Sequence, residues 1–173
     1  MSSNRICGVR ITDGVVKPEW IDYNGHMNVA YYLLAFDLSG DELWHEFGIT
    51  DEYVRITNKS TFAVECHITY QRELKEGEFY CITSQVLAYD EKRIHFFQRM
   101  YHAEERYLAA TVEWMNLHVD LGSRRVTQWP EHILTLIEEW VRQQKKGDYP
   151  GEAGKRMRVQ KPLYSLSESI GDE

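Results

Sequence analysis

The sequence predicts an α+β domain in which one long apolar helix precedes an antiparallel sheet and a second helix follows it. Three observations carry this prediction. Residues 29–47 are apolar at helical spacing, residues 62–120 contain runs that alternate apolar and polar side chains, and the turns between these runs are short. Short connections favour antiparallel neighbours, and a helix packed on such a sheet gives a two-layer α+β fold.

The first element is expected at Val15–Trp20, as a short strand. Pro18 marks either the end of this strand or a position at a sheet edge, because proline cannot donate a hydrogen bond to a neighbouring strand. A turn at residues 23–25 follows, with the sequence Tyr-Asn-Gly.

The long helix is expected at Val29–Phe47. Asn28 is a favourable N-cap and Gly48 a favourable stop signal. Because the helix is apolar on nearly every side, we expect it to be buried. Residues 49–59 are interpreted as a connector.

Four further strands are expected, at Phe62–Tyr70, Phe79–Tyr89, Arg93–His102 and Tyr107–Asp120, followed by a helix at Pro130–Lys146. The sheet therefore has five or six antiparallel strands. We expect a single domain over residues 1–146 and a polar tail over residues 147–173. One face and the edges of such a sheet need cover, which a homodimer or homotetramer would provide.

Composition and charge exclude several classes of protein. A length of 173 residues suits one domain with its own core. There is no apolar run long enough to span a membrane, and residues 1–10 lack the apolar stretch of a signal peptide. The net charge of −7 argues against general binding to nucleic acid or to anionic membranes.

The three cysteines, Cys7, Cys66 and Cys81, are odd in number and irregularly spaced. Cys66 and Cys81 fall in predicted strands. This pattern predicts reduced core thiols in the cytoplasm, with neither a disulfide framework nor a zinc site.

Residues 22–28, Asp-Tyr-Asn-Gly-His-Met-Asn, place a carboxylate, an amide and an imidazole immediately before the long helix. The free N–H groups and positive dipole of a helix start suit a thioester oxygen that becomes an oxyanion. A nearby carboxylate can activate water or attack the carbonyl. The alternative is structural, because Asn-Gly is a common turn and Asp and Asn commonly cap helices. From the motif alone both interpretations are open.

This segment resembles the hotdog-fold thioesterases, both the 4-hydroxybenzoyl-CoA thioesterase-like group and the plant acyl-ACP thioesterases. The plant enzymes carry Asp-x-Asn-x-His before the same helix, matched here by Asp22, Asn24 and His26. Their Glu after a Tyr-x-Arg segment is similar to Glu73. The resemblance extends over about residues 15–120 and implies a hotdog fold, a long central helix wrapped by an antiparallel sheet.

The resemblance also implies roles for individual residues. Asp22 is the candidate base or nucleophile, and Asn24 and His26 orient it or the attacking water. The backbone amides after Asn28 polarise the carbonyl. The substrate-binding candidates are Asn28, Val29, Tyr31 and Glu73. For Glu73 a solvated charge run is the stronger alternative.

Segments 66–74, 90–97 and 117–120 are similar to a narrower subgroup, the betainyl-CoA thioesterases of carnitine breakdown. The substrate expected from this resemblance is an acyl-CoA, specifically betainyl-CoA, with neither a cofactor nor a metal. His67, His95 and His102 show no metal-ligand spacing. The rival functions are a hotdog hydratase and a non-catalytic acyl-CoA-binding or sensor protein.

Two further groups of charged residues have a functional and a structural interpretation. Glu113 lies in an otherwise apolar strand. It either lines the substrate cavity or lies on an exposed face of the sheet, and we expect exposure. The basic residues of the tail either contact the phosphates of coenzyme A or are simply solvated; they are Lys155, Arg156, Arg158 and Lys161.

Overall fold

The structure is a computed structural model and describes residues 8–144 and 149–157. Its elements along the chain are β1 (Val9–Val15), the short 3₁₀ helix η1 (Pro18–Trp20), α1 (Val29–Glu46), α2 (Asp51–Thr57), β2 (Lys59–Tyr70), β3 (Phe79–Tyr89), β4 (Arg93–His102), β5 (Leu108–Asp120), β6 (Arg125–Val126) and α3 (Glu131–Gln143). The expected α+β layout with a terminal helix is confirmed. Cys7, Arg158 and Lys161 lie outside the described residues.

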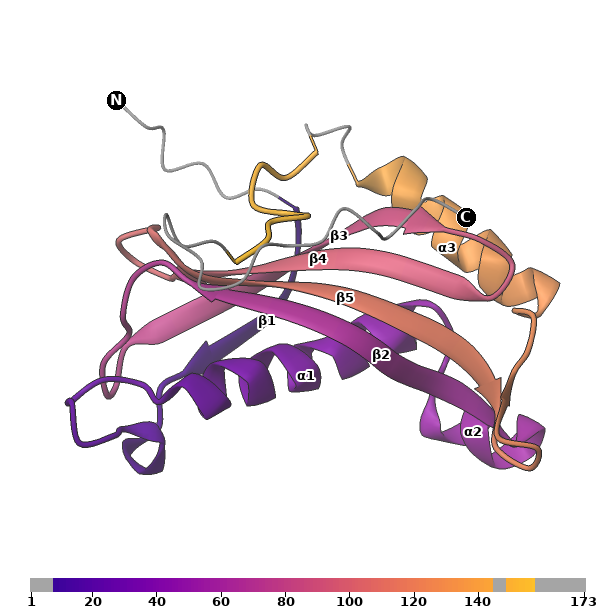
Figure 1. The fold of residues 1–173 in the computed structure, drawn as a ribbon, viewed down its shortest axis with the longest axis horizontal. Coiled ribbons are helices and arrows are strands. Elements are labelled where there is room, and N and C mark those ends of the chain that lie inside the picture. The colour runs from indigo at the N-terminus through magenta and orange to yellow at the C-terminus, as the bar shows by residue number, and fades with distance from the viewer. Residues whose placement is uncertain (1–7, 145–148, 158–173) are drawn as a thin grey trace, which may run out of the picture.

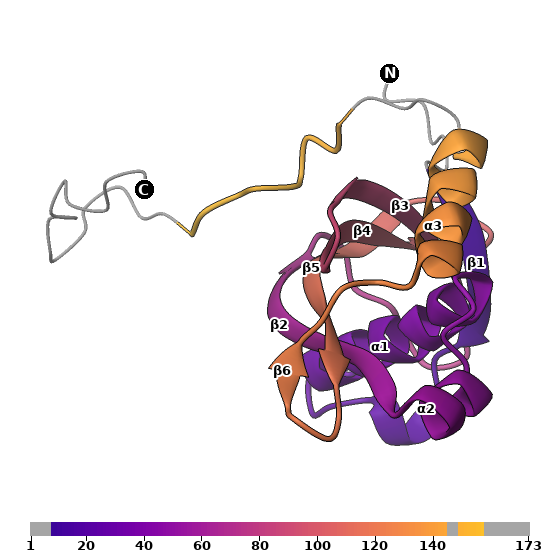
Figure 2. The ribbon, with the colours of Figure 1, turned by 90° about the vertical axis from the view of Figure 1, so that its right-hand side faces the viewer.

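The sheet is antiparallel and curls around α1 (Figures 1 and 2). Its strand order is β1-β3-β4-β5-β2, and the short β6 pairs with the end of β5. Residues of the concave face pack against the buried face of α1, as do residues of α3; the main contributors are Phe36, Leu43, Ile82, Ile94, Phe96, Val112, Ile133 and Ile137. The sheet therefore has an inner face that holds α1 and an outer face on the opposite side.

The N-terminal strand lies earlier in the chain than expected. Val15 ends β1, and Pro18 begins a 3₁₀ turn in place of a strand, because its fixed φ suits a first helical position. Gly14 pairs with Tyr80, and a Cβ at residue 14 would approach the Tyr80 ring to 2.3 Å. The glycine is therefore needed for the close packing of β1 on β3.

Helix α1 has the predicted N-cap and nearly the predicted length, but the expectation that it is buried all round was wrong. Val29, Leu34 and Leu38 are 56%, 40% and 52% exposed. A single sheet covers only one side of a helix, so the opposite side stays open to solvent within the described chain. The apolar side chains on that side therefore do not belong to the chain's own core, and their exposure needs another explanation.

Two features between α1 and β3 were missed from the sequence. Residues 51–57 of the expected connector form α2, capped by the Thr50 hydroxyl, which accepts from Tyr53 N–H at 3.2 Å. In β2 the register shifts between Ala63 and Glu65, which interrupts the expected alternation. Cys66 beyond this bulge is exposed, so its assignment as a core thiol was wrong, whereas Cys81 is buried.

His118 on β5 is fully buried and joins three parts of the fold. Its Nδ1 donates to the Gln128 carbonyl at 2.9 Å, and its Nε2 accepts from the Tyr53 hydroxyl at 2.9 Å. The ring also stacks on Trp129, with centroids 4.6 Å apart. Burial lowers the pKa of His118 from its usual 6.5, which favours the neutral imidazole. Because the Gln128 carbonyl can only accept, Nδ1 carries the proton and Nε2 is the acceptor for the Tyr53 hydroxyl.

This network makes the stability depend on pH. The unfolded state protonates His118 near its usual pKa, whereas the folded state resists protonation, so stability falls as pH drops below about 6.5. We expect urea denaturation at about pH 7.5 and about pH 5.5 to give two free energies of unfolding that differ less for His118→Gln than for the unchanged protein. His45→Gln, which alters an exposed histidine, is the matched control. An unchanged pH dependence in His118→Gln would contradict the account.

Candidate active site

The segment before α1 is a tight hairpin. Ile21 and Met27 form an antiparallel bridge, Asp22 N–H donates to the His26 carbonyl at 3.1 Å, and Gly25 N–H donates to the Asp22 carbonyl at 3.0 Å. Gly25 has φ +81°, which an L side chain rarely adopts. The hairpin therefore turns at the residue that the sequence predicted.

A second set of hydrogen bonds fixes the hairpin to the body of the domain. Met27 N–H donates to the Leu74 carbonyl at 2.8 Å, and Leu74 N–H donates to the Tyr32 hydroxyl at 2.9 Å. Asn28 N–H donates to the Trp20 carbonyl at 2.9 Å. Asp22 thus directly follows Ile21 of the Ile21–Met27 bridge, in the hairpin that precedes the start of α1.

Two of the three predicted catalytic side chains are brought together. Asp22 Oδ1 accepts from Asn24 N–H at 2.8 Å, and Asp22 Oδ2 lies 3.4 Å from the Asn24 side-chain nitrogen. The His26 ring instead has Nδ1 at 3.3 Å from the Met27 carbonyl. The Asp22–Asn24 contacts also form an Asx turn, so they serve the local structure as well as orienting the carboxylate.

The helix start offers one open donor. The Asn28 side chain accepts from Ala30 N–H at 3.0 Å, and its carbonyl accepts from Tyr31 N–H at 3.0 Å. Within the described residues, Val29 N–H makes no hydrogen bond, and Val29 is more than half exposed. No acidic residue occupies the first turn to neutralise the helix dipole. Among the amides that the sequence predicted to polarise a carbonyl, that of Val29 is therefore the candidate with an open N–H.

Tyr70 was not recognised as a site residue from the sequence. It lies at the end of β2, and its hydroxyl donates to the Val29 carbonyl at 3.2 Å while its ring meets Tyr32 edge-on at 5.4 Å. Burial raises the pKa of Tyr70, so it remains a neutral donor beside the helix start. The sequence signal that could have identified Tyr70 is its place as the first residue of the Tyr-x-Arg segment that precedes Glu73.

Glu73 precedes Leu74, the residue that bonds the hairpin, and is itself held by its backbone rather than by its carboxylate. Its carbonyl accepts from the Tyr107 hydroxyl at 2.9 Å, and burial raises the pKa of Tyr107 to about 12. The carboxylate is half exposed and lies 3.8 Å from Lys75 Nζ. This geometry favours the solvated charge run over a direct catalytic part for the side chain.

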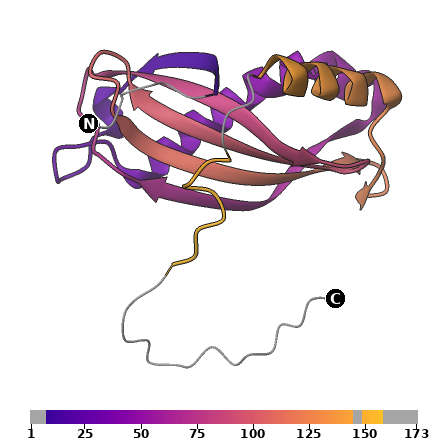
Figure 3. The same ribbon diagram turned by 90° about the horizontal axis from the view of Figure 1, so that it is seen from above.

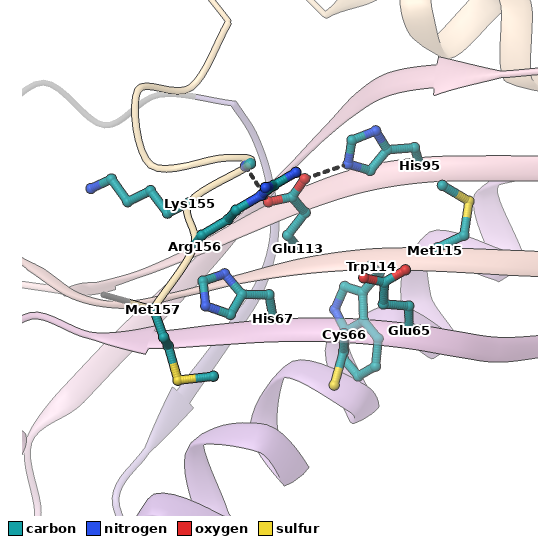
Figure 4. A pocket seen from close by; sticks show the side chains of 11 residues that line it. Glu65, Cys66, His67, His95, Glu113, Trp114, Met115, Lys155, Arg156 and Met157 are labelled. Carbon is teal, nitrogen blue, oxygen red and sulfur yellow. Dashed lines mark hydrogen bonds and ion pairs between the residues drawn. The ribbon is translucent and has the colours of Figure 1, made fainter. Parts of the chain in front are cut away.

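A separate cavity of about 490 Å³, lined by charged, imidazole and apolar side chains, lies on the outer face of the sheet beside residues 154–157 (Figure 4). Glu113 lines it, 2.7 Å from His95 Nε2, and also accepts from Gly154 N–H at 2.7 Å. The expectation that Glu113 is exposed was wrong, because the segment 149–157 crosses this face (Figure 3) and leaves its side chain 16% exposed.

Asp22 does not line this cavity, whereas Lys155 and Arg156 do. Across the described ranges there is no group of three His, Cys, Asp or Glu placed to hold a metal. None of the described helices is long and apolar enough to cross a membrane.

Comparison with known proteins decides the family. The model of the thioesterase-like superfamily matches residues 16–137. The chain belongs to this superfamily. The match includes the hairpin, α1 and the whole of β2 to β5, so it covers the candidate site.

Two curated relatives carry related names. The betainyl-CoA thioesterase of Pseudomonas aeruginosa is 35% identical over 123 residues, 71% of this chain and 77% of that protein. The L-carnitine dehydrogenase/betainyl-CoA thioesterase of Rhizobium meliloti is 36% identical over 149 residues, 86% of this chain. The chain spans only 30% of the length of the Rhizobium protein.

Solved structures confirm the hotdog fold. A Staphylococcus aureus protein solved in complex with CoA has a TM-score of 0.83 and 27% identity, over 91% of this chain and 99% of that one. A putative thioesterase of Pseudomonas putida has a TM-score of 0.77 and 27% identity, over 90% of this chain and 99% of that one. The resemblance inferred from the hairpin motif and the strand patterns is therefore correct at the level of family and fold.

The cap at the helix start gives a stability prediction. Asn28→Ala removes the acceptor of Ala30 N–H and should lower the free energy of unfolding by about 1 kcal/mol. Thr50→Ala removes the corresponding cap of α2 and should cost a similar amount. Chemical denaturation of both variants checks this. No loss in Asn28→Ala would show that the cap does not hold the helix start.

Proposed function

We propose that this protein hydrolyses an acyl-CoA thioester, with betainyl-CoA as the specific substrate. The observation that carries the proposal is the unpaired Val29 N–H at an exposed helix start beside the Asp22 hairpin. Such a donor suits an oxygen that gains charge during acyl transfer. The names of the relatives and the CoA-bound neighbour support the substrate class.

The chemistry follows from these two groups. Asp22 either takes a proton from water as it attacks the thioester carbon or attacks that carbon itself. The carbonyl oxygen becomes an oxyanion that accepts from Val29 N–H. The tetrahedral adduct then collapses, the C–S bond breaks and the CoA thiolate leaves. On the second route, water cleaves the resulting anhydride. Both routes give a free carboxylic acid and CoA.

In this scheme Asn24 and His26 hold the Asp22 carboxylate and the attacking water in position. The acyl group lies against the helix start formed by the N-cap Asn28 and by Tyr31 in the first turn. The Tyr70 hydroxyl holds the backbone at Val29 by donating to the Val29 carbonyl. Glu73 belongs to the segment that carries the hairpin, next to Leu74. The exposed thiol of Cys66 supports our further proposal that the protein works in the reducing cytoplasm.

The function is tested with purified protein and a panel of acyl-CoA thioesters that includes betainyl-CoA. Thiol release, followed with a thiol-reactive dye, is expected to be fastest with betainyl-CoA. A change in enoyl absorbance without thiol release would identify a hydratase instead. Saturable binding with neither signal would identify a non-catalytic acyl-CoA-binding protein.

Asp22→Asn should keep the fold and lower kcat/KM for thiol release by about 100-fold or more, because the amide can neither accept the proton nor attack. The Asn24 N–H can still donate to the new amide oxygen, so the hairpin is retained. Asp37→Asn, which alters an exposed carboxylate of α1, is the control. Full activity in Asp22→Asn would remove Asp22 from the mechanism.

We also propose that the chain forms a homodimer through β2, or a homotetramer built from two such dimers. The outer edge of β2 has no strand partner among residues 8–144 and 149–157, although the strand is 12 residues long. An open edge of this length is normally covered. The exposed Leu34 and Leu38 of α1 supply apolar surface for the same or a second contact.

Sedimentation equilibrium should give at least twice the chain mass of 20.5 kDa. Val64→Lys places a charge on the exposed bulge of β2 and should shift the protein toward monomer. Val126→Lys on β6, a similarly exposed valine, should not. A monomeric unchanged protein would refute the dimer, and equal behaviour of the two variants would refute the role of β2.

A further inference from the structure

A pair of stacked aromatic rings stands at the start of α1. The rings of Trp20 and Tyr31 lie 5.5 Å apart, centroid to centroid, and are inclined by only 12°. Tyr31 is in the first turn of α1, and the Trp20 carbonyl accepts from Asn28 N–H at the cap. The stack is therefore built into the same few residues that present the open Val29 N–H.

A positive charge already occupies this aromatic surface. Lys17 Nζ lies 5.3 Å from the centroid of the Trp20 ring, within the range of a cation–π contact. Lys17 itself is exposed, whereas Trp20 is buried. The ammonium group thus lies on the solvent side of the contact and the indole on the protein side.

We propose that the Trp20–Tyr31 pair determines substrate specificity by binding the cationic head of the acyl group, and that Lys17 holds this position until the substrate displaces it. The inference rests on the proposed function and assigns the residues that select its substrate. A quaternary ammonium has no N–H, so it is recognised by aromatic faces rather than by hydrogen bonds.

The position agrees with the chemistry of the substrate. In a betainyl thioester one methylene separates the trimethylammonium nitrogen from the carbonyl carbon. With its carbonyl oxygen at Val29 N–H, the proposed substrate keeps its cation close to the first turn of α1, to which Tyr31 belongs. The positive end of the helix dipole opposes a cation there. Aromatic faces on Trp20 and Tyr31, together with the Asp22 carboxylate, offset this repulsion.

The test compares betainyl-CoA with 3,3-dimethylbutyryl-CoA, in which a carbon atom replaces the charged nitrogen while the shape is kept. The ratio of the two kcat/KM values reports the recognition of charge. Trp20→Leu should lower this ratio by about tenfold, mainly by raising KM for betainyl-CoA, and Trp20→Phe should retain most of it. Lys17→Met should lower KM for betainyl-CoA more than KM for the neutral thioester, because both substrates displace the Lys17 side chain but only the cationic one is repelled by its charge.

Trp129→Leu is the matched control, since this indole is equally buried but stacks on His118 on a different part of the fold. It should leave the ratio unchanged. If Trp20→Leu still hydrolyses the neutral thioester and the ratio stays at its original value, the inference is overturned and the proposed function stands. If the unchanged protein hydrolyses neither thioester, the proposed function fails and the inference fails with it.

Discussion

The site depends on how the first turn of α1 is held. Asn28 satisfies Ala30 N–H with its side chain and Tyr31 N–H with its carbonyl, and its own N–H is satisfied by Trp20. Among the described residues Asn28 to Tyr31, these three bonds leave the Val29 N–H without a partner. A helix start with no cap would fray, whereas one with every amide paired could not polarise a substrate. The cap therefore stabilises this end of the helix and leaves open the donor on which the proposed chemistry depends.

The position of the hairpin follows from the sheet rather than from the helix alone. Leu74, which follows β2, accepts from Met27 and donates to Tyr32, so the loop after an edge strand holds the hairpin to α1. Tyr70 at the end of the same strand reaches the Val29 carbonyl. Any shift in the end of β2 is thus transmitted to the carboxylate and the helix start together. Pairing of β2 with a second copy would make that end more rigid.

The sequence was most informative where local rules decide the structure. The Asn28 cap, the turn at Gly25 and strands β3 and β4 were predicted closely, since each depends on residues adjacent in the chain. Helix α2 was missed because seven residues give little periodicity. The exposed side of α1 was missed because apolar composition does not reveal whether a second layer covers it.

The remaining site features depend on contacts between distant residues. Tyr70 contacts Val29 across 41 positions, and Gly154 covers Glu113 across another 41. The Tyr-x-Arg segment pointed to Tyr70 itself, but no spacing rule predicts either of these contacts. The motif therefore predicted which residues form the hairpin, but not which amide remains open. The Trp20–Tyr31 stack was likewise beyond reach, since aromatic content alone does not show which rings face each other.

The proposed mechanism requires the thioester carbonyl oxygen to accept a hydrogen bond from Val29 N–H. The most direct test is an amide NMR spectrum of the ¹⁵N-labelled protein, titrated with a ketone analogue of betainyl-CoA in which a methylene replaces the sulfur and prevents cleavage. The account predicts that the Val29 amide resonance shifts downfield on saturation, with smaller changes at Asp22 and Tyr31. An unmoved Val29 resonance, with changes confined to His95 and Glu113 on the outer face, would contradict it.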